Sequence, residues 1–213
     1  MLGVSRWILA ALKVAHPTAA FRFIYRHRMW GSESASGPGS TLFGTRVIRE
    51  ALPTIIERFG VRSIADVPCG DWHWMQQVDL SKVDYTGGDL VPELVEEIAA
   101  RFGGPNRQFV TLDLRSSPLP KVDLFLCRDA LFHFSNRDAC AALANIRASG
   151  SRLLLSTTWT DGVQHNRNIR TSRWRRIDLR LPPFNLPEPL ETFPELHPTE
   201  PARAMCLWRL AGS

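Results

Sequence analysis

The sequence SIADVPCGDW at residues 63–72, together with YTGGDL at residues 85–90, decides the fold. The first stretch is an apolar strand that ends in Asp66 and a tight turn with Gly70. The second is a short strand that ends in Asp89, nineteen positions after that glycine. A carboxylate at the end of the second strand of an α/β sheet can bind the hydroxyls of a ribose. The two stretches therefore predict a sheet that binds a nucleoside.

The turn after the first strand lacks the glycines of a pyrophosphate site. Such a site needs several free backbone N–H groups and a close approach of the backbone, hence the pattern G-x-G-x-x-G. Here Pro68 removes one N–H donor and fixes φ, and Trp72 stands where a third glycine is expected. The turn therefore favours a nucleoside without phosphates over NAD.

Length and composition predict a single domain with a sizeable core. The chain has 213 residues, of which 44% are hydrophobic and 22% are charged. Residues 1–30 hold five of the 26 basic side chains and none of the 21 acidic ones, so the rest of the chain is formally neutral. The net charge of +5 therefore describes the N-terminus, and we expect no nucleic-acid partner.

The four cysteines form no C-x-x-C pair, and no His or Cys cluster has the spacing of a zinc site. We expect reduced thiols, a cytoplasmic location and no metal. No run of 18 apolar residues is present, and the apolar segment 7–12 is too short for a membrane span. The basic start of the chain is typical of a helix packed on its own domain, with contact to an anionic membrane surface as the alternative.

Strands and helices alternate along most of the chain, which predicts a doubly wound parallel sheet in one α/β domain. We expect two short helices within residues 1–30, broken near His16-Pro17, and a loop at 31–40. The remaining expected elements are a helix from Ser40 or Thr41 to about Ala51, a helix from Pro53 that Gly60 ends, strand 62–67, a helix from about Trp72, strand 83–87, helix 91–102, strands 107–112 and 122–127, helix 136–147, strand 152–157, and strand-like runs at 174–181 and 204–210.

Polar residues follow five successive strands at their carboxyl ends, where ligands of such sheets bind. A lone acid in this position is usually a turn residue or a helix cap. Acids after four successive strands are harder to explain in that way. The residues are Asp66 with Gly70, Asp89, Asp113, Arg128 with Asp129, and Thr157 with Thr158.

Four phrases carry a resemblance to a known family: DVPCGDWHWM at 66–75, GGD-x-VPEL at 87–94, LCRD-x-LFH at 126–133 and PPFNLP at 182–187. With them the chain resembles a bacterial group of class I S-adenosylmethionine-dependent methyltransferases, from about Trp30 to the C-terminus. The resemblance implies a Rossmann-like sheet of seven strands whose last strand, at 204–210, is antiparallel. It also implies a methyltransferase domain over 41–213, preceded by a helical extension and possible lid loop over 1–40.

The resemblance also implies a set of residues that bind S-adenosylmethionine. Asp66 and the turn Pro68, Cys69, Gly70 and Asp71 would meet the methionine end, and Arg128 would close the amino-acid side. Asp89 with Leu90 would bind the ribose, and Asp113 with Leu114 would meet the adenine. A methyltransferase turn meets a carboxylate and an amine rather than a pyrophosphate, so it tolerates fewer glycines.

His133 is the candidate general base, because imidazole can take a proton from an acceptor hydroxyl near neutral pH. Asp129 is the rival base, or a residue that orients the acceptor. The alternative for His133 is packing between Phe132 and Phe134. Methyl transfer is an in-line displacement in which positioning supplies most of the rate, so a base matters only if the acceptor must lose a proton.

Three segments are candidates for binding the acceptor. The loop with Ser36, Gly37, Gly39 and Ser40, preceded by Trp30, is placed to close over the pocket, although it can also be a simple linker. Trp72 can stack on a ligand or pack in the core. Asn166 and Asn168 lie in an arginine-rich stretch, residues 165–176, that is either an acceptor-recognising edge or a solvated loop.

We therefore expect an S-adenosylmethionine-dependent methyltransferase that modifies an oxygen of a small polar molecule. One alternative is a methyltransferase-like binding or scaffold protein without turnover. The other is an NAD-dependent oxidoreductase, which the chemistry of the turn disfavours.

Overall fold

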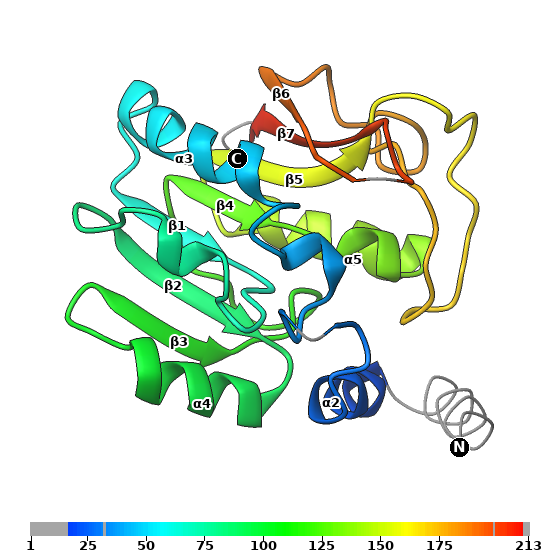
Figure 1. Cartoon of the computed structure of the whole chain (residues 1–213). Helices are drawn as coiled ribbons and strands as arrows, with labels where there is room; N and C mark the ends of the chain where they lie inside the picture. The colour runs from blue at the N-terminus through cyan, green and yellow to red at the C-terminus, as the bar shows by residue number, and fades with distance from the viewer. Residues whose placement is uncertain (1–16, 32, 198, 211–213) are drawn as a thin grey trace.

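Seven strands form one sheet in the order β3-β2-β1-β4-β5-β7-β6 (Figure 1). The computed structural model describes residues 17–31, 33–197 and 199–210. The strands are β1 (Ser63–Asp66), β2 (Asp84–Asp89), β3 (Arg107–Thr111), β4 (Leu124–Cys127), β5 (Leu153–Trp159), β6 (Glu191–Pro194) and β7 (Arg203–Arg209). The strands β1 to β5 pair in parallel, and β7 is antiparallel to both β5 and β6. The predicted doubly wound sheet and its antiparallel last strand are confirmed.

The predicted strand at 174–181 is wrong, because both edges of the neighbouring strand β5 are already occupied by β4 and β7. Within β5 the segment bonds to the last two residues: the Trp159 N–H donates to the Ile177 carbonyl (2.8 Å), and the Leu179 N–H donates to Thr158 Oγ1 (3.0 Å). The other edge of β7 pairs with β6 instead. This short strand was not predicted, because its sequence is rich in proline.

The helices are α2 (Pro17–Arg26), α3 (Arg46–Arg58), α4 (Pro92–Phe102) and α5 (Asn136–Ala148), with short 3₁₀ turns η1 (Pro38–Ser40), η2 (Met75–Gln77) and η3 (Leu131–His133). The expected helices at 91–102 and 136–147 are confirmed. The Ser135 hydroxyl caps α5 by accepting a hydrogen bond from the Asp138 N–H (3.1 Å).

The break predicted at Pro53 is wrong, because α3 runs through it as one helix. A proline inside a helix removes one backbone hydrogen bond. The apolar residues Ile48, Leu52 and Ile55 nevertheless stay in phase across the proline, and all three are buried in the core. Burial of this continuous face outweighs the lost bond.

The helix predicted from about Trp72 is also wrong, and only the single turn η2 forms there. Gly70 and Trp72 both have a φ of 56°, in the left-handed region, which a right-handed helix cannot pass through. Trp72, Trp74 and Met75 are instead buried under the sheet as part of its core.

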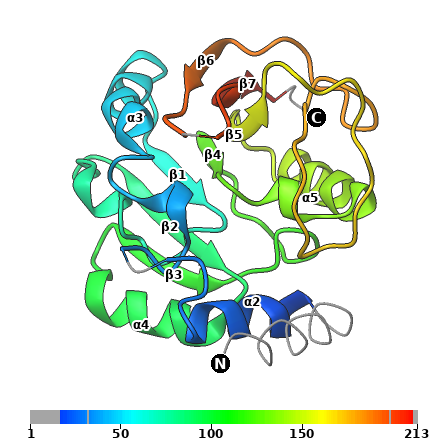
Figure 2. The same cartoon turned by 45° about the vertical axis from the view of Figure 1, so that its right-hand side comes forward.

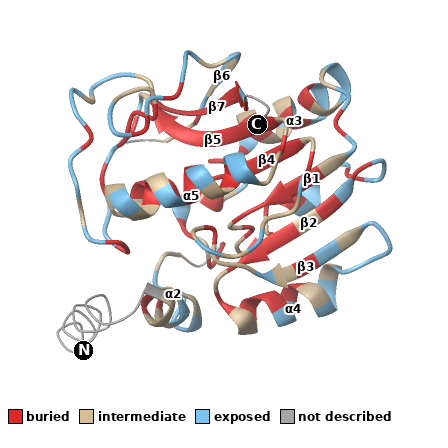
Figure 3. Cartoon of the chain, turned by 180° about the vertical axis from the view of Figure 1, so that it is seen from behind, coloured by how far each residue is buried: buried red, intermediate tan, exposed pale blue. Residues whose placement is uncertain are grey.

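The core lies on both faces of the sheet, and successive residues of one strand supply alternate faces. In β4, Leu124 and Leu126 pack with α3 and α4, whereas Phe125 and Cys127 pack with α5. Figure 3 shows the central strands as the most buried part of the chain.

The helix α2 lies beside α4, near the carboxyl ends of β1 and β2 (Figures 1 and 2). Arg22 forms an ion pair with Glu93 of α4 (2.5 Å), and the Tyr25 hydroxyl donates to Glu97. The second expected helix is α2, while the first expected helix and the break near His16-Pro17 lie outside the described residues or at their edge. The domain boundary at residue 40 stays a prediction. No helix among the described residues is long and apolar enough to cross a bilayer.

Candidate active site

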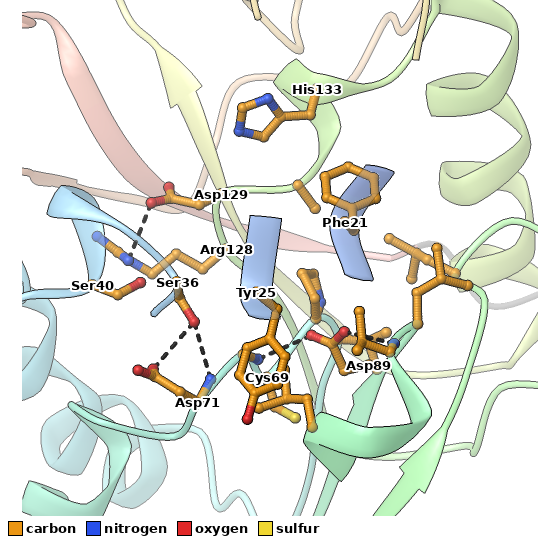
Figure 4. Close-up of a pocket in the computed structure, with 18 of the residues that line it drawn as sticks. Phe21, Tyr25, Ser36, Ser40, Cys69, Asp71, Asp89, Arg128, Asp129 and His133 are labelled. Atoms are coloured by element: carbon orange, nitrogen blue, oxygen red, sulfur yellow. Dashed lines mark hydrogen bonds and ion pairs between the residues drawn. The ribbon is translucent and has the colours of Figure 1, made fainter. Parts of the chain in front are cut away.

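A cavity lies at the carboxyl edge of the sheet, between the ends of β1, β2, β3 and β4 and the covering segment formed by α2 and the loop after it (Figure 4). Its walls contain most of the residues predicted for the site: Trp30, Ser36, Ser40, Asp66, Pro68, Cys69, Gly70, Asp71, Asp89, Leu90, Asp113, Leu114, Arg128, Asp129 and His133. Strand ends that are far apart in the sequence thus meet in one place, as the parallel sheet requires.

Asp89 is buried at the end of β2 and is held by the turn that follows β1. Its Oδ2 accepts a hydrogen bond from the Gly70 N–H (3.2 Å), and its Oδ1 accepts one from the Val91 N–H (3.1 Å). Burial raises the pKa of Asp89 to about 6, although these two N–H groups act in the opposite direction. The carboxylate is therefore mostly ionised at neutral pH and faces the cavity.

Asp66 is buried at the end of β1, where the Tyr85 hydroxyl donates to its Oδ2 (2.6 Å). Burial raises the pKa of Asp66 to about 7, and the bond from Tyr85 and the charge of Arg128 oppose this rise only in part. Asp66 is thus a carboxyl group that gains or loses its proton near neutral pH.

Asp113 is bound on both oxygens by Arg115, a residue that the sequence reasoning missed. Arg115 donates from Nε to Oδ1 (2.9 Å) and from Nη2 to Oδ2 (2.6 Å). Burial acts to raise the pKa of Asp113, but the hydrogen bonds and charge of Arg115 lower it overall. Since Arg115 also lines the cavity, the pair presents a guanidinium face beside Leu114.

Asp129 belongs to a buried cluster of two acids and two arginines. Its Oδ1 accepts from Arg203 (2.5 Å) and Thr157 (3.0 Å), and its Oδ2 lies 3.3 Å from Arg128 Nη1. Glu195 bridges the same two arginines, with Arg128 Nη2 at 2.5 Å and Arg203 Nε at 2.6 Å. Despite burial, the two arginine charges lower the pKa of Asp129 to about 2. So weak a base does not take a proton at neutral pH, which argues against the rival base.

Sequence reasoning missed Glu195 and Arg203. A signal for Arg203 was present: it opens the last strand, and an antiparallel strand begins at the edge where its parallel neighbours end. Glu195 lies in the proline-rich stretch after β6, where no periodicity marks it.

His133 lies in η3 at the side of the cavity (Figure 4). Its Nδ1 is 2.8 Å from the Arg173 carbonyl, which can only accept, so Nδ1 carries the proton and the neutral ring has its lone pair on Nε2. The ring stacks on Trp30, with centroids 5.6 Å apart and planes 12° apart, and it also packs on Phe132 at 4.5 Å. The ring is thus both packed and held in one tautomer.

The loop before η1 is tied to the turn after β1 through Asp71. Its carboxylate accepts from Ser34 Oγ (2.9 Å), the Ala35 N–H (2.7 Å) and Ser36 Oγ (3.1 Å), as Figure 4 shows for Ser36. The Asp71 N–H in turn donates to Ser36 Oγ (3.0 Å). These hydrogen bonds hold the loop against the turn that lines the cavity, which a simple linker would not require.

Gly37 and Gly39 belong to this loop but do not line the cavity. A Cβ on Gly39 would lie 2.4 Å from Asp129 Oδ2, and the Gly39 carbonyl accepts from Arg128 Nη2 (2.8 Å). Gly37 has a φ of 105°, a conformation that other residues rarely adopt. The two glycines thus allow the conformation of the loop, whereas Ser36 and Ser40 line the cavity.

Comparisons with known proteins agree on the fold. No protein-family model matches the sequence, and no curated protein matches it either. The solved structures that resemble the chain include magnesium protoporphyrin IX methyltransferase from Synechocystis PCC 6803 with bound S-adenosylhomocysteine (13% identity, 89% of this chain and 94% of that one, TM-score 0.60). A 1,6-didemethyltoxoflavin-N1-methyltransferase from Burkholderia thailandensis has 17% identity, coverage of 99% and 92%, and a TM-score of 0.61. Human N-acetylserotonin methyltransferase has 12% identity, coverage of 93% and 57%, and a TM-score of 0.59.

The chain has the class I methyltransferase fold. At these identities the likeness concerns the fold, and the roles of single residues stay proposals.

Besides the two glycines, three more residues predicted to bind the acceptor do not line the cavity: Trp72, Asn166 and Asn168. Trp72 is 3% exposed and packs on Tyr85, Phe102 and Phe109, so it is a core residue. The two asparagines belong to the loop after β5 and do not line the cavity.

Asn166 and Asn168 hold the loop after β5 instead of facing the cavity. The Asn166 amide donates to the Asp178 carbonyl (2.8 Å) and accepts from the Asp178 N–H (3.0 Å). Asn168 Oδ1 accepts from the Asn136 N–H at the start of α5 (2.8 Å). The Asn166 amide and the Asn168 oxygen therefore hydrogen-bond within the protein, which the residue type alone does not reveal.

The helix α2 supplies Phe21, Ile24 and Tyr25 to the cavity wall of the methyltransferase fold. The amphipathic pattern predicted a packed helix but not the surface against which it packs. Among the described residues, no three His, Cys, Asp or Glu side chains lie close enough together to hold a metal ion.

Proposed function

We propose that the chain is an S-adenosylmethionine-dependent methyltransferase that methylates an oxygen of a small acceptor. One observation carries the proposal: the buried carboxylate of Asp89 shares one cavity with His133, and both face it from the carboxyl edge of the sheet. The fold that the chain shares with solved methyltransferases supports the cofactor and the reaction class, and the oxygen acceptor is proposed from His133.

The residues present fit this cofactor. Both acids line the cavity: Asp89 would accept from the two ribose hydroxyls, and Asp66 would accept from the methionine amino group. The apolar side chains Leu90, Leu112 and Leu114 offer surface to the adenine ring. Five aspartates and two arginines line the cavity, which suits a ligand with a positive charge better than a dinucleotide with two phosphates.

The turn supports the same choice over NAD. The Gly70 N–H already donates to Asp89, and Pro68 has none, so the turn offers few donors to a pyrophosphate. Arg128 lines the cavity, but its guanidinium is bonded to Glu195 and to the Gly39 carbonyl. We therefore assign Arg128 to holding the loop as well as to the amino-acid side of the cofactor.

When bound, the cofactor supplies a methyl group activated by its sulfonium. His133 then serves to take the proton of the acceptor hydroxyl at Nε2, since the bond from Nδ1 to the Arg173 carbonyl fixes the tautomer. Asp129 keeps its charge and orients Arg128 and Arg203. Phe21, Trp30 and the loop at Ser36 cover the acceptor side and exclude water.

Calorimetry with S-adenosylmethionine, S-adenosylhomocysteine and NAD tests the cofactor. We expect the two sulfur ligands to bind and NAD not to bind. A folded sample that binds neither sulfur ligand would contradict the proposal. A screen of metabolites with labelled cofactor then identifies the acceptor by the mass of its product. Tight binding of the sulfur ligands with no transfer to any metabolite would favour the scaffold alternative.

A further inference from the structure

The arginine-rich loop after β5 contains a buried cation, Arg175, that forms no ion pair with an acid among the described residues. Three arginines are buried among the described residues: Arg128, Arg175 and Arg203. Two of them, Arg128 and Arg203, are neutralised by Asp129 and Glu195. Arg175 is 2% exposed, and within the described ranges no carboxylate forms an ion pair with it.

The hydrogen-bond acceptors of Arg175 in the described part of the chain are neutral. Its guanidinium donates to the Phe134 carbonyl and to Asn136 Oδ1 (2.8 Å), and its Nε has no hydrogen-bond partner in the described part of the chain. Burial and the nearby charge of Arg167 lower the pKa of Arg175 to about 10. A buried charge without a counter-charge is costly, and two neutral acceptors offset only part of that cost. The arrangement therefore favours a negative group beside Arg175.

An open groove borders Arg175 on the surface, away from the cavity of the candidate active site. His165, Arg167 and Arg176 also line it, and Trp174 forms part of its wall. Trp174 is 48% exposed and presents an aromatic face beside these cations. Planar guanidinium groups bind oxyanions through pairs of parallel hydrogen bonds.

The two acids in the groove are engaged with other partners. Glu200 bonds to Arg176 Nε (2.7 Å) and to Trp159 Nε1 (2.8 Å). Asp161 accepts the N–H of Gly162 (2.6 Å). Among the described residues neither acid forms an ion pair with Arg167 or Arg175, and the three arginines of the groove outnumber its two acids.

We propose that this groove binds an oxyanion, such as a phosphate group, between Arg167 and Arg175. This second site is distinct from the candidate active site, so anion binding can be measured without methyl transfer. The chain connects the two sites, because Thr171 lines the cavity and Trp174 lines the groove. Between them the Ser172 N–H donates to the His133 carbonyl (2.7 Å), and the Arg173 carbonyl accepts from the His133 ring. An anion bound to Arg175 would steady the loop that holds His133.

The test is a calorimetric titration of the full chain with inorganic phosphate, with chloride adjusted to keep the ionic strength constant. We expect saturable binding that Arg167→Gln weakens by roughly tenfold or more, as the loss of a charge-assisted hydrogen bond requires. Arg147→Gln is the matched control, since it removes the same charge from an exposed position at the far end of α5. It should leave the affinity unchanged. Arg175→Gln should abolish binding, and Arg167→Gln alone suffices if that variant does not fold.

Phenyl phosphate separates two sources of the anion. Tighter binding than that of inorganic phosphate, lost in Trp174→Ala, would support an organic phosphate whose body lies on Trp174. Equal affinities would support a free anion. The proposal is overturned if phosphate shows no saturable binding, or if Arg167→Gln and Arg147→Gln lower the affinity equally.

Discussion

Replacing Asp66 with asparagine should stabilise the protein while weakening its binding of S-adenosylhomocysteine. Asp66 is buried at the end of β1, and burial raises its pKa from 3.8 to about 7. Asparagine has the same shape and keeps an oxygen that can accept the Tyr85 hydroxyl, which lies 2.6 Å from the carboxylate. The variant therefore removes a buried charge and little else.

The size of the effect follows from the difference in pKa between the folded and unfolded chain. An unfolded aspartate ionises near pH 3.9, so between about pH 4 and pH 7 the folded protein binds the extra proton, and stability falls as the pH rises. At about 1.4 kcal/mol per pH unit, the wild-type protein loses roughly 2–4 kcal/mol over this range. Asp66→Asn lacks that loss. Its advantage should be largest near pH 8 and should shrink toward pH 4.

Urea unfolding at a series of pH values measures the free energy of unfolding, and calorimetry at pH 8 measures the affinity for S-adenosylhomocysteine. We expect binding to weaken by roughly tenfold, because a charged acceptor for the amino group is lost. Asp84→Asn, at the exposed start of β2, is the control and should change neither quantity. Parallel pH profiles for wild type and Asp66→Asn would refute the reasoning.

The remaining predictions concern the ribose, the base and the ion cluster. Asp89→Ala should weaken the binding of S-adenosylhomocysteine by roughly 1–3 kcal/mol in calorimetry, and an unchanged dissociation constant would exclude the ribose assignment. His133→Ala should slow turnover by roughly 10²–10⁴-fold with cofactor affinity intact, whereas full activity would leave it a packing residue. Glu195→Gln should lower the free energy of unfolding by roughly 3–5 kcal/mol in urea titrations, because Arg128 and Arg203 lose a buried counter-charge. Unchanged stability would show that Asp129 alone neutralises both arginines.

The sheet could be predicted from the sequence because its signals are local. Alternating apolar runs, the capped start of α5 and the glycines after α4 all act within one element. The failures arose where distant contacts decide the structure. Pro53 stays inside α3 because its neighbours pack on the sheet, and residues 174–181 form no strand because β4 and β7 already flank β5.

The candidate site divides in the same way. Asp66, Asp89 and Asp113 could be placed together because parallel strands end at one edge. Glu195 joins the site only through its ion pairs with Arg128 and Arg203, which no short motif records. Asn166 has a residue type suited to recognising a ligand, yet its amide closes a turn of its own loop. Residue type and position in a motif therefore predict strand ends better than they predict loops.

The carboxylate of Asp71 joins two segments that would meet different ligands. It lies in the turn proposed to hold the cofactor, and it binds the loop proposed to cover the acceptor. If a ligand on the turn steadies that loop, it raises the affinity for a ligand under the loop, and linkage demands that the second ligand raise the affinity for the first by the same factor. The two substrates would then bind cooperatively, and the product of one transfer would leave more slowly while its partner stayed in place.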